Sequence, residues 1–223
     1  MNIIDDIPVR LEREAVVESL RLSSNSLHVV KKIGELIDSI TPVMRPKAIY
    51  TSSMVEYNTG DEVSIDGRIF TSKVLGKNLE NIERCYPYIV TAGRELEEIV
   101  LPKGQSVMML DLVKNIVVGK AFQYTKALIA EKHNVQHITE MSPGHLDNWP
   151  LSQQRVLFNL FGSEVEKIGV RLTEMFNMVP LKTVSGILFS SESGFQSCQI
   201  CTQPRCMGRK TAYDPRIAKM YSI

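Results

Sequence analysis

The sequence predicts a single mixed domain of α-helices and β-strands, with antiparallel strand pairing in at least its first half. The 223 residues are enough to bury a substantial core, and 43% of them are hydrophobic and 23% charged, as in ordinary soluble domains. Helix-like and strand-like patterns alternate along the chain, and no internal repeat or obvious linker divides it. In addition, Asp66-Gly67 lies between two short alternating runs, which is typical of a β-hairpin turn.

The first half begins with an amphipathic helix followed by strands. From Ser24 to Ile40 apolar residues recur at intervals of three and four, and Pro42 follows as a stop signal. Residues 47–57 have the composition of a strand, and residues 63–70 alternate around the Asp-Gly pair. We therefore expect an antiparallel hairpin early in the chain.

Three shorter elements are expected next. Ser72 is a suitable N-cap for a helix that extends to about Cys85, because its hydroxyl can accept a bond from the first helical turn. Residues 86–92 form an apolar run typical of a buried strand. Residues 95–100 resemble a short helix that ends before Pro102-Lys103-Gly104.

The second half is dominated by a long helix from Ser106 to Lys132, whose apolar residues recur with helical spacing and predict a central, buried position. A strand is expected at residues 135–139, a short helix at residues 150–161, and another strand at residues 181–190. The tail beyond Gly194 has an irregular pattern and is basic.

The charge balance argues against nucleic-acid and membrane partners. There are 26 Lys and Arg against 25 Asp and Glu, which gives a formal net charge of +1. The most apolar stretch, Val107 to Phe122, is interrupted by charged residues and does not meet the requirement for a transmembrane helix. No secretory signal is visible at the N-terminus, so we expect a cytoplasmic protein.

Three of the four cysteines lie within nine residues of the tail. Cys198, Cys201 and Cys206 form a C-x2-C-x4-C pattern, in which two thiolates can hold one metal centre and a third can return to it. Three interpretations remain open: an iron–sulfur cluster with an exchangeable iron, a zinc ion completed by Cys85 or a histidine such as His145, or free, redox-active thiols.

The segment from Arg171 to Pro180, followed by Val184-Ser185-Gly186 and Phe189-Ser190, resembles the activation domain of cobalamin-dependent methionine synthase. That family has the same order of Leu-Thr-Glu, Phe, Met, Pro, Val-Ser-Gly and Phe-Ser. Ser142-Pro143-Gly144-His145 falls where the family has its Pro-Gly-Tyr turn for S-adenosylmethionine, and residues 91–98 are also similar. The similarity is strong from about Tyr88 to Ser190.

The resemblance implies an α+β fold, with a twisted, largely antiparallel sheet packed by helices that include one long central helix. It also implies a repair role, in which the chain docks on a separate corrinoid-binding protein or split methionine synthase. Cob(II)alamin carried by that partner would be methylated reductively with S-adenosylmethionine. The electron would come from a donor of the flavodoxin or ferredoxin type. Residues 1–194 would form the activation-like domain, and residues 195–223 a cysteine-bearing tail.

The resemblance also supplies candidate residues for binding the cofactor. They are Glu140, Ser142, Pro143, Gly144, His145 and Glu174. The family has an arginine four residues before the turn glycine, where this chain has Glu140, so the charge expected to bind the ligand's carboxylate is reversed. Glu174 interrupts an apolar run and is either bonded to nearby backbone or presented to a cationic ligand. The alternative function is an iron–sulfur or zinc-binding redox or interaction protein on the same fold that has lost S-adenosylmethionine binding.

Overall fold

A computed structural model describes residues 1–19, 27–101, 103–192, 194–206 and 208–221. Its centre is an eight-stranded sheet in which β6 (Arg84–Thr91) is flanked by β2 and β3 on one side and by β10 on the other. The pairs in this sheet are antiparallel. The other strands of the sheet are β1 (Asn2–Ile4), β2 (Lys47–Tyr50), β3 (Ser53–Asn58), β4 (Glu62–Ile65), β5 (Arg68–Thr71), β7 (Ile138–Met141) and β10 (Thr183–Ser190).

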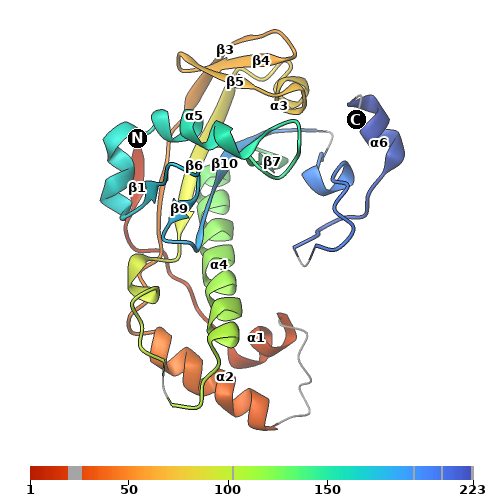
Figure 1. Ribbon diagram of the computed structural model, residues 1–223. Coiled ribbons are helices and arrows are strands. Elements are labelled where there is room, and N and C mark those ends of the chain that lie inside the picture. The colour runs from red at the N-terminus through yellow and green to blue at the C-terminus, as the bar shows by residue number, and fades with distance from the viewer. Residues whose placement is uncertain (20–26, 102, 193, 207, 222–223) are drawn as a thin grey trace.

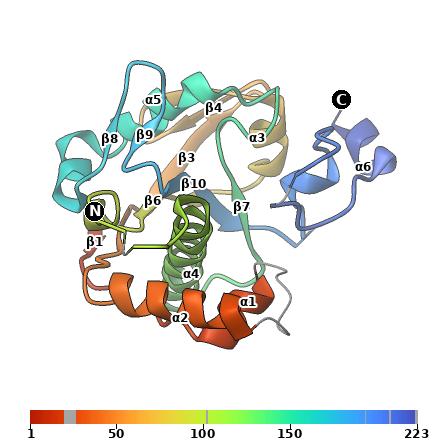
Figure 2. The same cartoon turned by 60° about the horizontal axis from the view of Figure 1, so that its bottom comes forward.

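Helices cover both faces of this sheet (Figures 1 and 2). One face is covered by the long α4 (Val107–His133), and α1 (Arg13–Ser19) and α2 (Leu27–Ile40) lie beside the end of α4 that extends beyond the sheet. The other face carries α3 (Lys73–Asn78), α5 (Gln154–Asn159) and the small hairpin of β8 (Arg171–Leu172) and β9 (Met178–Val179). The tail, with α6 (Pro215–Met220), lies beside the sheet (Figure 1).

The sheet has a separate apolar core on each face. Along β6, Tyr88 and Val90 pack toward α4, whereas Cys85 and Ile89 pack toward α5. Successive side chains of a strand point to opposite faces, so a strand buried on both faces reads as a continuous apolar run. The predicted α+β class, with a largely antiparallel sheet and one long helix, is thereby confirmed.

Local signals located several elements correctly. Ser72 and Ser106 cap α3 and α4 by accepting bonds from the backbone N–H groups of Leu75 and Met109. The Asp66-Gly67 pair connects β4 and β5, with both residues at positive φ. These features depend on residues close together in sequence, which is why the pattern sufficed to find them.

The strand predicted at residues 47–57 is interrupted after Tyr50, although β2 and β3 keep the same register along β6. Pro87 explains the interruption. The backbone N–H of Thr51 donates to Pro87 O at 3.1 Å, but proline has no N–H for the reciprocal bond. A single long strand is therefore divided by one missing donor on its partner.

Other boundaries were predicted wrongly. The helix beginning after Ser72 ends at Asn78, because the chain must turn to enter β6, which already contains Cys85. The helix expected at residues 95–100 is only a single 3₁₀ turn, η1 (Arg94–Leu96), and β7 lies at Ile138–Met141 rather than at residues 135–139. Residues 24–26, at the start of the helix expected at residues 24–40, lie outside the described residues, and so does Pro102.

The helix predicted at residues 150–161 is divided. It consists of the 3₁₀ turn η2 (Leu151–Gln153) and α5, and a further 3₁₀ helix, η3 (Gly162–Ile168), follows. No helix in the described part of the chain is long and apolar enough to cross a membrane.

The tail is more ordered than its pattern indicated. It contains the 3₁₀ turn η4 (Ser197–Gln199) and α6, and its Phe195, Ile200 and Ala218 are buried in the core on the α5 face. The ring of Tyr221 lies 5.0 Å from that of Phe195, and its hydroxyl donates to Asn78 Oδ1 at 3.1 Å. Apolar burial and these contacts hold the tail against α3.

Candidate functional site

The candidate site is built around the turn that follows β7. Ser142 to His145 forms the expected turn: the N–H of His145 donates to Ser142 O at 3.4 Å, and Gly144 has a φ of 84°. The N–H of Gly144 also donates to Trp149 O at 2.7 Å, and the side chain of Trp149 is fully buried. The turn is therefore anchored to the core rather than being a loose surface loop.

Gly186 on β10 allows this turn to lie close to the sheet. A Cβ atom at Gly186 would lie 2.3 Å from Met141 O and 2.7 Å from Ser142 Oγ, which is closer than such contacts permit. Glycine at the end of the Val184-Ser185-Gly186 segment is therefore required for steric reasons. It lets β7 and the start of the turn approach β10.

Glu140 on β7 lies between two lysines that come from distant parts of the chain. Lys126 Nζ of α4 lies 3.1 Å from Glu140 Oε2, and Lys210 Nζ of the tail lies 2.5 Å from Oε1. Burial alone would raise the pKa of Glu140, but the hydrogen bonds and charges of the two lysines outweigh it and hold the pKa below its ordinary value. Glu140 is therefore a carboxylate at neutral pH, and its charge is more than balanced.

A cavity of about 320 Å³ adjoins this cluster. One wall consists of Lys126 and the β7 residues up to Glu140, and the other consists of tail residues from Gly194 to Lys210. A second cavity of about 320 Å³ lies next to it, and His145 lines both. The turn of the candidate site thus separates two hollows that the tail helps to enclose.

His145 has a lowered pKa. Desolvation by its surroundings is the main cause, Lys210 adds to the effect and Glu140 opposes it. Although the side chain keeps contact with solvent, its imidazole is neutral at pH 7 and can both donate and accept a hydrogen bond.

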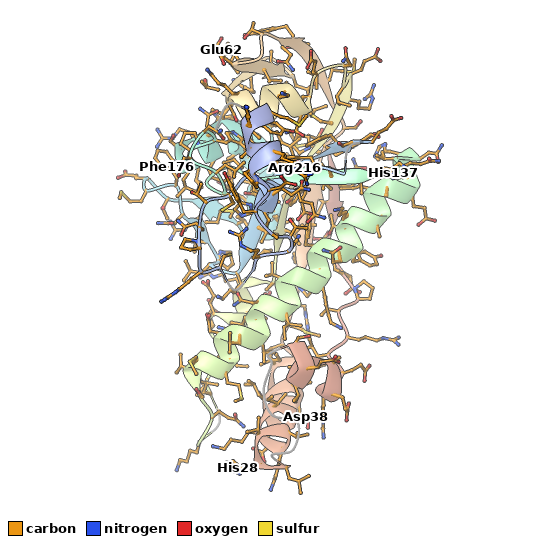
Figure 3. The ribbon with its side chains drawn as sticks, turned by 90° about the vertical axis from the view of Figure 1, so that its right-hand side faces the viewer. His28, Asp38, Glu62, His137, Phe176 and Arg216 are labelled. Atoms are coloured by element: carbon orange, nitrogen blue, oxygen red, sulfur yellow. The ribbon has the colours of Figure 1, made fainter. Side chains whose placement is uncertain are left out.

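Glu174 is not brought to the turn. It lies at the exposed tip of the β8–β9 hairpin, where the N–H of Thr173 donates to Asn177 O at 2.9 Å. Phe176 in the same hairpin and His137 in the cavity wall are well separated in Figure 3. Among the described residues Glu174 has no hydrogen-bonding or ionic partner, and it lines neither cavity. The geometry therefore groups Glu140 and residues 142–145 without Glu174.

The cysteines of the tail lie on both sides of His145. Cys198 lines the first cavity and Cys201 the second, both half-buried, whereas Cys206 is exposed. The guanidinium of Arg209 donates to the carbonyl oxygens of Cys198 at 3.0 Å and Cys201 at 3.1 Å. The same group also donates to the carbonyls of Gln203 and Thr211. Arg209 thus ties together the backbone of this loop through four carbonyl groups.

The cysteines do not form an assembled metal centre. In the parts of the chain that the structure describes, no group of three His, Cys, Asp or Glu side chains is placed to hold a metal ion. Cys85, considered as a zinc ligand, is fully buried in β6, and burial raises the pKa of its thiol. The arrangement therefore supports neither the iron–sulfur nor the zinc interpretation.

The sequence analysis did not identify Lys126 and Lys210 as partners of Glu140. Lys210 counted only as one of several basic tail residues, and Lys126 lies within the long helix. Lys126 is 14 residues from Glu140 in the sequence and Lys210 is 70 residues from it. The pairing therefore becomes visible only when α4 and the tail are placed beside β7.

No protein-family model and no curated protein matches the sequence. A search of solved structures found the crystal structure of the MetH reactivation domain bound to AdoHcy, with a TM-score of 0.54 and 14% sequence identity. The match covers 85% of this chain and 78% of that chain. The two proteins share a fold.

Proposed function

We propose that this protein binds an S-adenosyl compound and acts as a reactivation component for a separate corrinoid-binding protein, such as a split methionine synthase. The observation that carries the proposal is the fold likeness, across 85% of the chain, to a reactivation domain whose structure contains AdoHcy. The anchored turn at Ser142 to His145, with a cavity on either side, supports a ligand site in this region.

The residues around the turn are compatible with an S-adenosyl ligand. The first cavity combines an apolar wall at Phe195 with the charged groups of Lys126, Glu140 and Lys210. A site of this kind suits a ligand with an apolar body and a charged end. S-adenosylmethionine, when bound, would supply a methyl group on a sulfonium centre. The chain's own residues would orient it: the turn as a rigid support, and the neutral His145 as a hydrogen-bonding group beside it.

The reactivation role requires an electron from outside the chain. Methyl transfer to reduced cobalt would make an unfavourable one-electron reduction effectively irreversible. A donor of the flavodoxin or ferredoxin type would supply that electron.

Two titrations test the proposal. Calorimetry with AdoHcy should show binding to a single site. A purified cobalamin-binding module of methionine synthase should bind the protein more tightly in its cob(II)alamin state than in its methylated state. Equal affinity for both states, or no complex at all, would remove the reactivation role.

A second candidate function is a redox-active or interaction protein on the same fold, which would bind a metal only if further ligands joined the tail cysteines. The observation that favours it is the position of Cys198 and Cys201 on either side of His145. Anaerobic purification, metal analysis and electron paramagnetic resonance would distinguish the candidates. Stoichiometric iron or zinc together with no AdoHcy binding would favour this second function, and a metal-free protein that binds AdoHcy would favour the first.

A further inference from the structure

We propose that Lys126, Glu140 and Lys210 together bind the α-amino-acid end of the ligand, with the two lysines holding its carboxylate and Glu140 holding its ammonium group. This inference rests on the proposed function, because it assigns residues to one end of the S-adenosyl ligand. It also assigns a binding role to the tail, which supplies Lys210.

The charge balance of the cluster favours a carboxylate. Two ammonium groups face one carboxylate, so the three side chains carry a net charge of +1. The other ionisable groups in the cavity wall are His137, His145 and Cys198, and His145 is neutral at pH 7. The cavity therefore attracts an anion although Glu140 stands where an arginine was expected.

Hydrogen-bonding capacity remains for a ligand. Each lysine ammonium has three donors, and the structure gives each one bond to Glu140. A carboxylate has about four acceptor positions, of which the lysines use two. The cluster can thus donate to a carboxylate and still accept from an ammonium, which is the pattern that a zwitterionic amino acid presents.

Burial makes these contacts effective without closing the site. The side chains of Lys126 and Glu140 are 23% and 26% exposed, whereas that of Lys210 is 56% exposed. The inner pair is therefore held in place, and Lys210 is accessible from solvent. Arg209, the neighbour of Lys210, fixes the backbone here through its bonds to the carbonyls of Cys198 and Cys201.

The test compares two ligands that differ only at the amino-acid end. AdoHcy carries that end, and 5′-methylthioadenosine has the same nucleoside thioether without it. We would measure both affinities by calorimetry for the full chain and for Lys126→Met and Lys210→Met. Lys219→Met is the control, because Lys219 is an exposed lysine of the same tail and does not line the cavity.

We expect Lys126→Met and Lys210→Met each to weaken AdoHcy binding by roughly 10- to 100-fold, the usual effect of losing a hydrogen bond to a charged group. Their affinity for 5′-methylthioadenosine should stay within about twofold of the full chain's. Lys219→Met should change neither affinity. Lys210→Arg, which keeps the charge, should retain most of the AdoHcy affinity and shows whether the Met variant fails for a structural reason.

Two results would overturn the inference in different ways. If the lysine variants bind AdoHcy as tightly as the full chain, or lose both ligands equally, the charged cluster does not bind the amino-acid end. If the unmodified protein binds neither ligand, the proposed function itself fails, and the assignment of the cluster falls with it.

Discussion

Two glutamates that the sequence placed in one candidate site have opposite surroundings. Glu140 lies in a strand of the central sheet, with its side chain 26% exposed and bonded to two lysines. Glu174 lies at the tip of a two-stranded hairpin and is exposed. Glu174, in the segment from Arg171 to Pro180 that carries the family resemblance, is thus the less constrained of the two carboxylates. Glu140, unlike Glu174, has partners that distant elements of the chain bring to it.

The variant with the largest expected effect is Gly186→Ala, which acts where β10 meets the turn at Ser142 to His145. The added Cβ would collide with Met141 O and Ser142 Oγ, so β7 and the turn must move away from β10. We expect a loss of about 2–3 kcal/mol in the free energy of unfolding, measured by urea denaturation, and loss of AdoHcy binding.

Gly119→Ala is the matched control for that variant. Gly119 lies in the exposed part of α4, and a Cβ there would meet nothing within 4 Å. Alanine is a better helix former than glycine, so we expect the free energy of unfolding to rise by about 0.5–1 kcal/mol. Unchanged stability of Gly186→Ala beside this control would show that the close approach of β7 to β10 is unimportant.

Glu140→Gln should have the next largest effect, because it leaves two ammonium groups without the carboxylate between them. We expect the free energy of unfolding to fall by about 1–2 kcal/mol at pH 7. The lysines lower the pKa of Glu140 in the folded state, so the unfolded chain takes up its proton at a higher pH. The stabilisation is therefore present above the ordinary glutamate pKa and lost as the pH falls through the folded value.

Urea denaturation of the parent and Glu140→Gln proteins between pH 7 and pH 3 would measure this dependence. The difference between the two proteins in free energy of unfolding should shrink as the pH falls below about 4.3, the ordinary pKa of glutamate. A difference that is constant across this range would mean that the two ion pairs contribute nothing to stability.

Arg209→Ala should have a smaller, local effect on the tail. Its guanidinium bonds to the carbonyls of Cys198 and Cys201 are lost, while the buried Phe195 and Ile200 remain in the core. We expect Cys198 and Cys201 to react several-fold faster with a thiol reagent, and the unfolding midpoint to change little. Mass spectrometry of the labelled peptides measures the first effect, and circular dichroism the second.

Arg209→Lys separates charge from geometry in the same loop. One ammonium group cannot reproduce the planar set of donors that contacts four carbonyls, so labelling should be nearly as fast as in Arg209→Ala. Labelling at the parent rate would show that the positive charge alone orders the loop.

Glu174→Gln should have the smallest effect. The side chain is exposed and has no ion pair or hydrogen bond among the described residues, so stability should change by less than about 0.5 kcal/mol. AdoHcy affinity should also be unchanged. A large loss of affinity would return Glu174 to the ligand site and reverse the comparison with Glu140.

Much of the fold follows from patterns within a few residues. The periodicity of α4, the cap at Ser72 and the Asp66-Gly67 turn are local and were predicted from sequence. Errors arose where a distant residue acted on an element. Pro87 interrupts a strand that lies more than thirty residues before it, and entry into β6 shortens α3.

The sequence by itself determined the mixed fold class and the position of the turn at Ser142 to His145. Only the tertiary structure decided the charge of the site. A charge pattern read along the chain shows Glu140 as a reversal, but the folded chain places Lys126 and Lys210 on either side of it. The reason is physical: backbone conformation depends on near neighbours, whereas electrostatic interactions depend on distance in space and are strongest where burial weakens the screening by water.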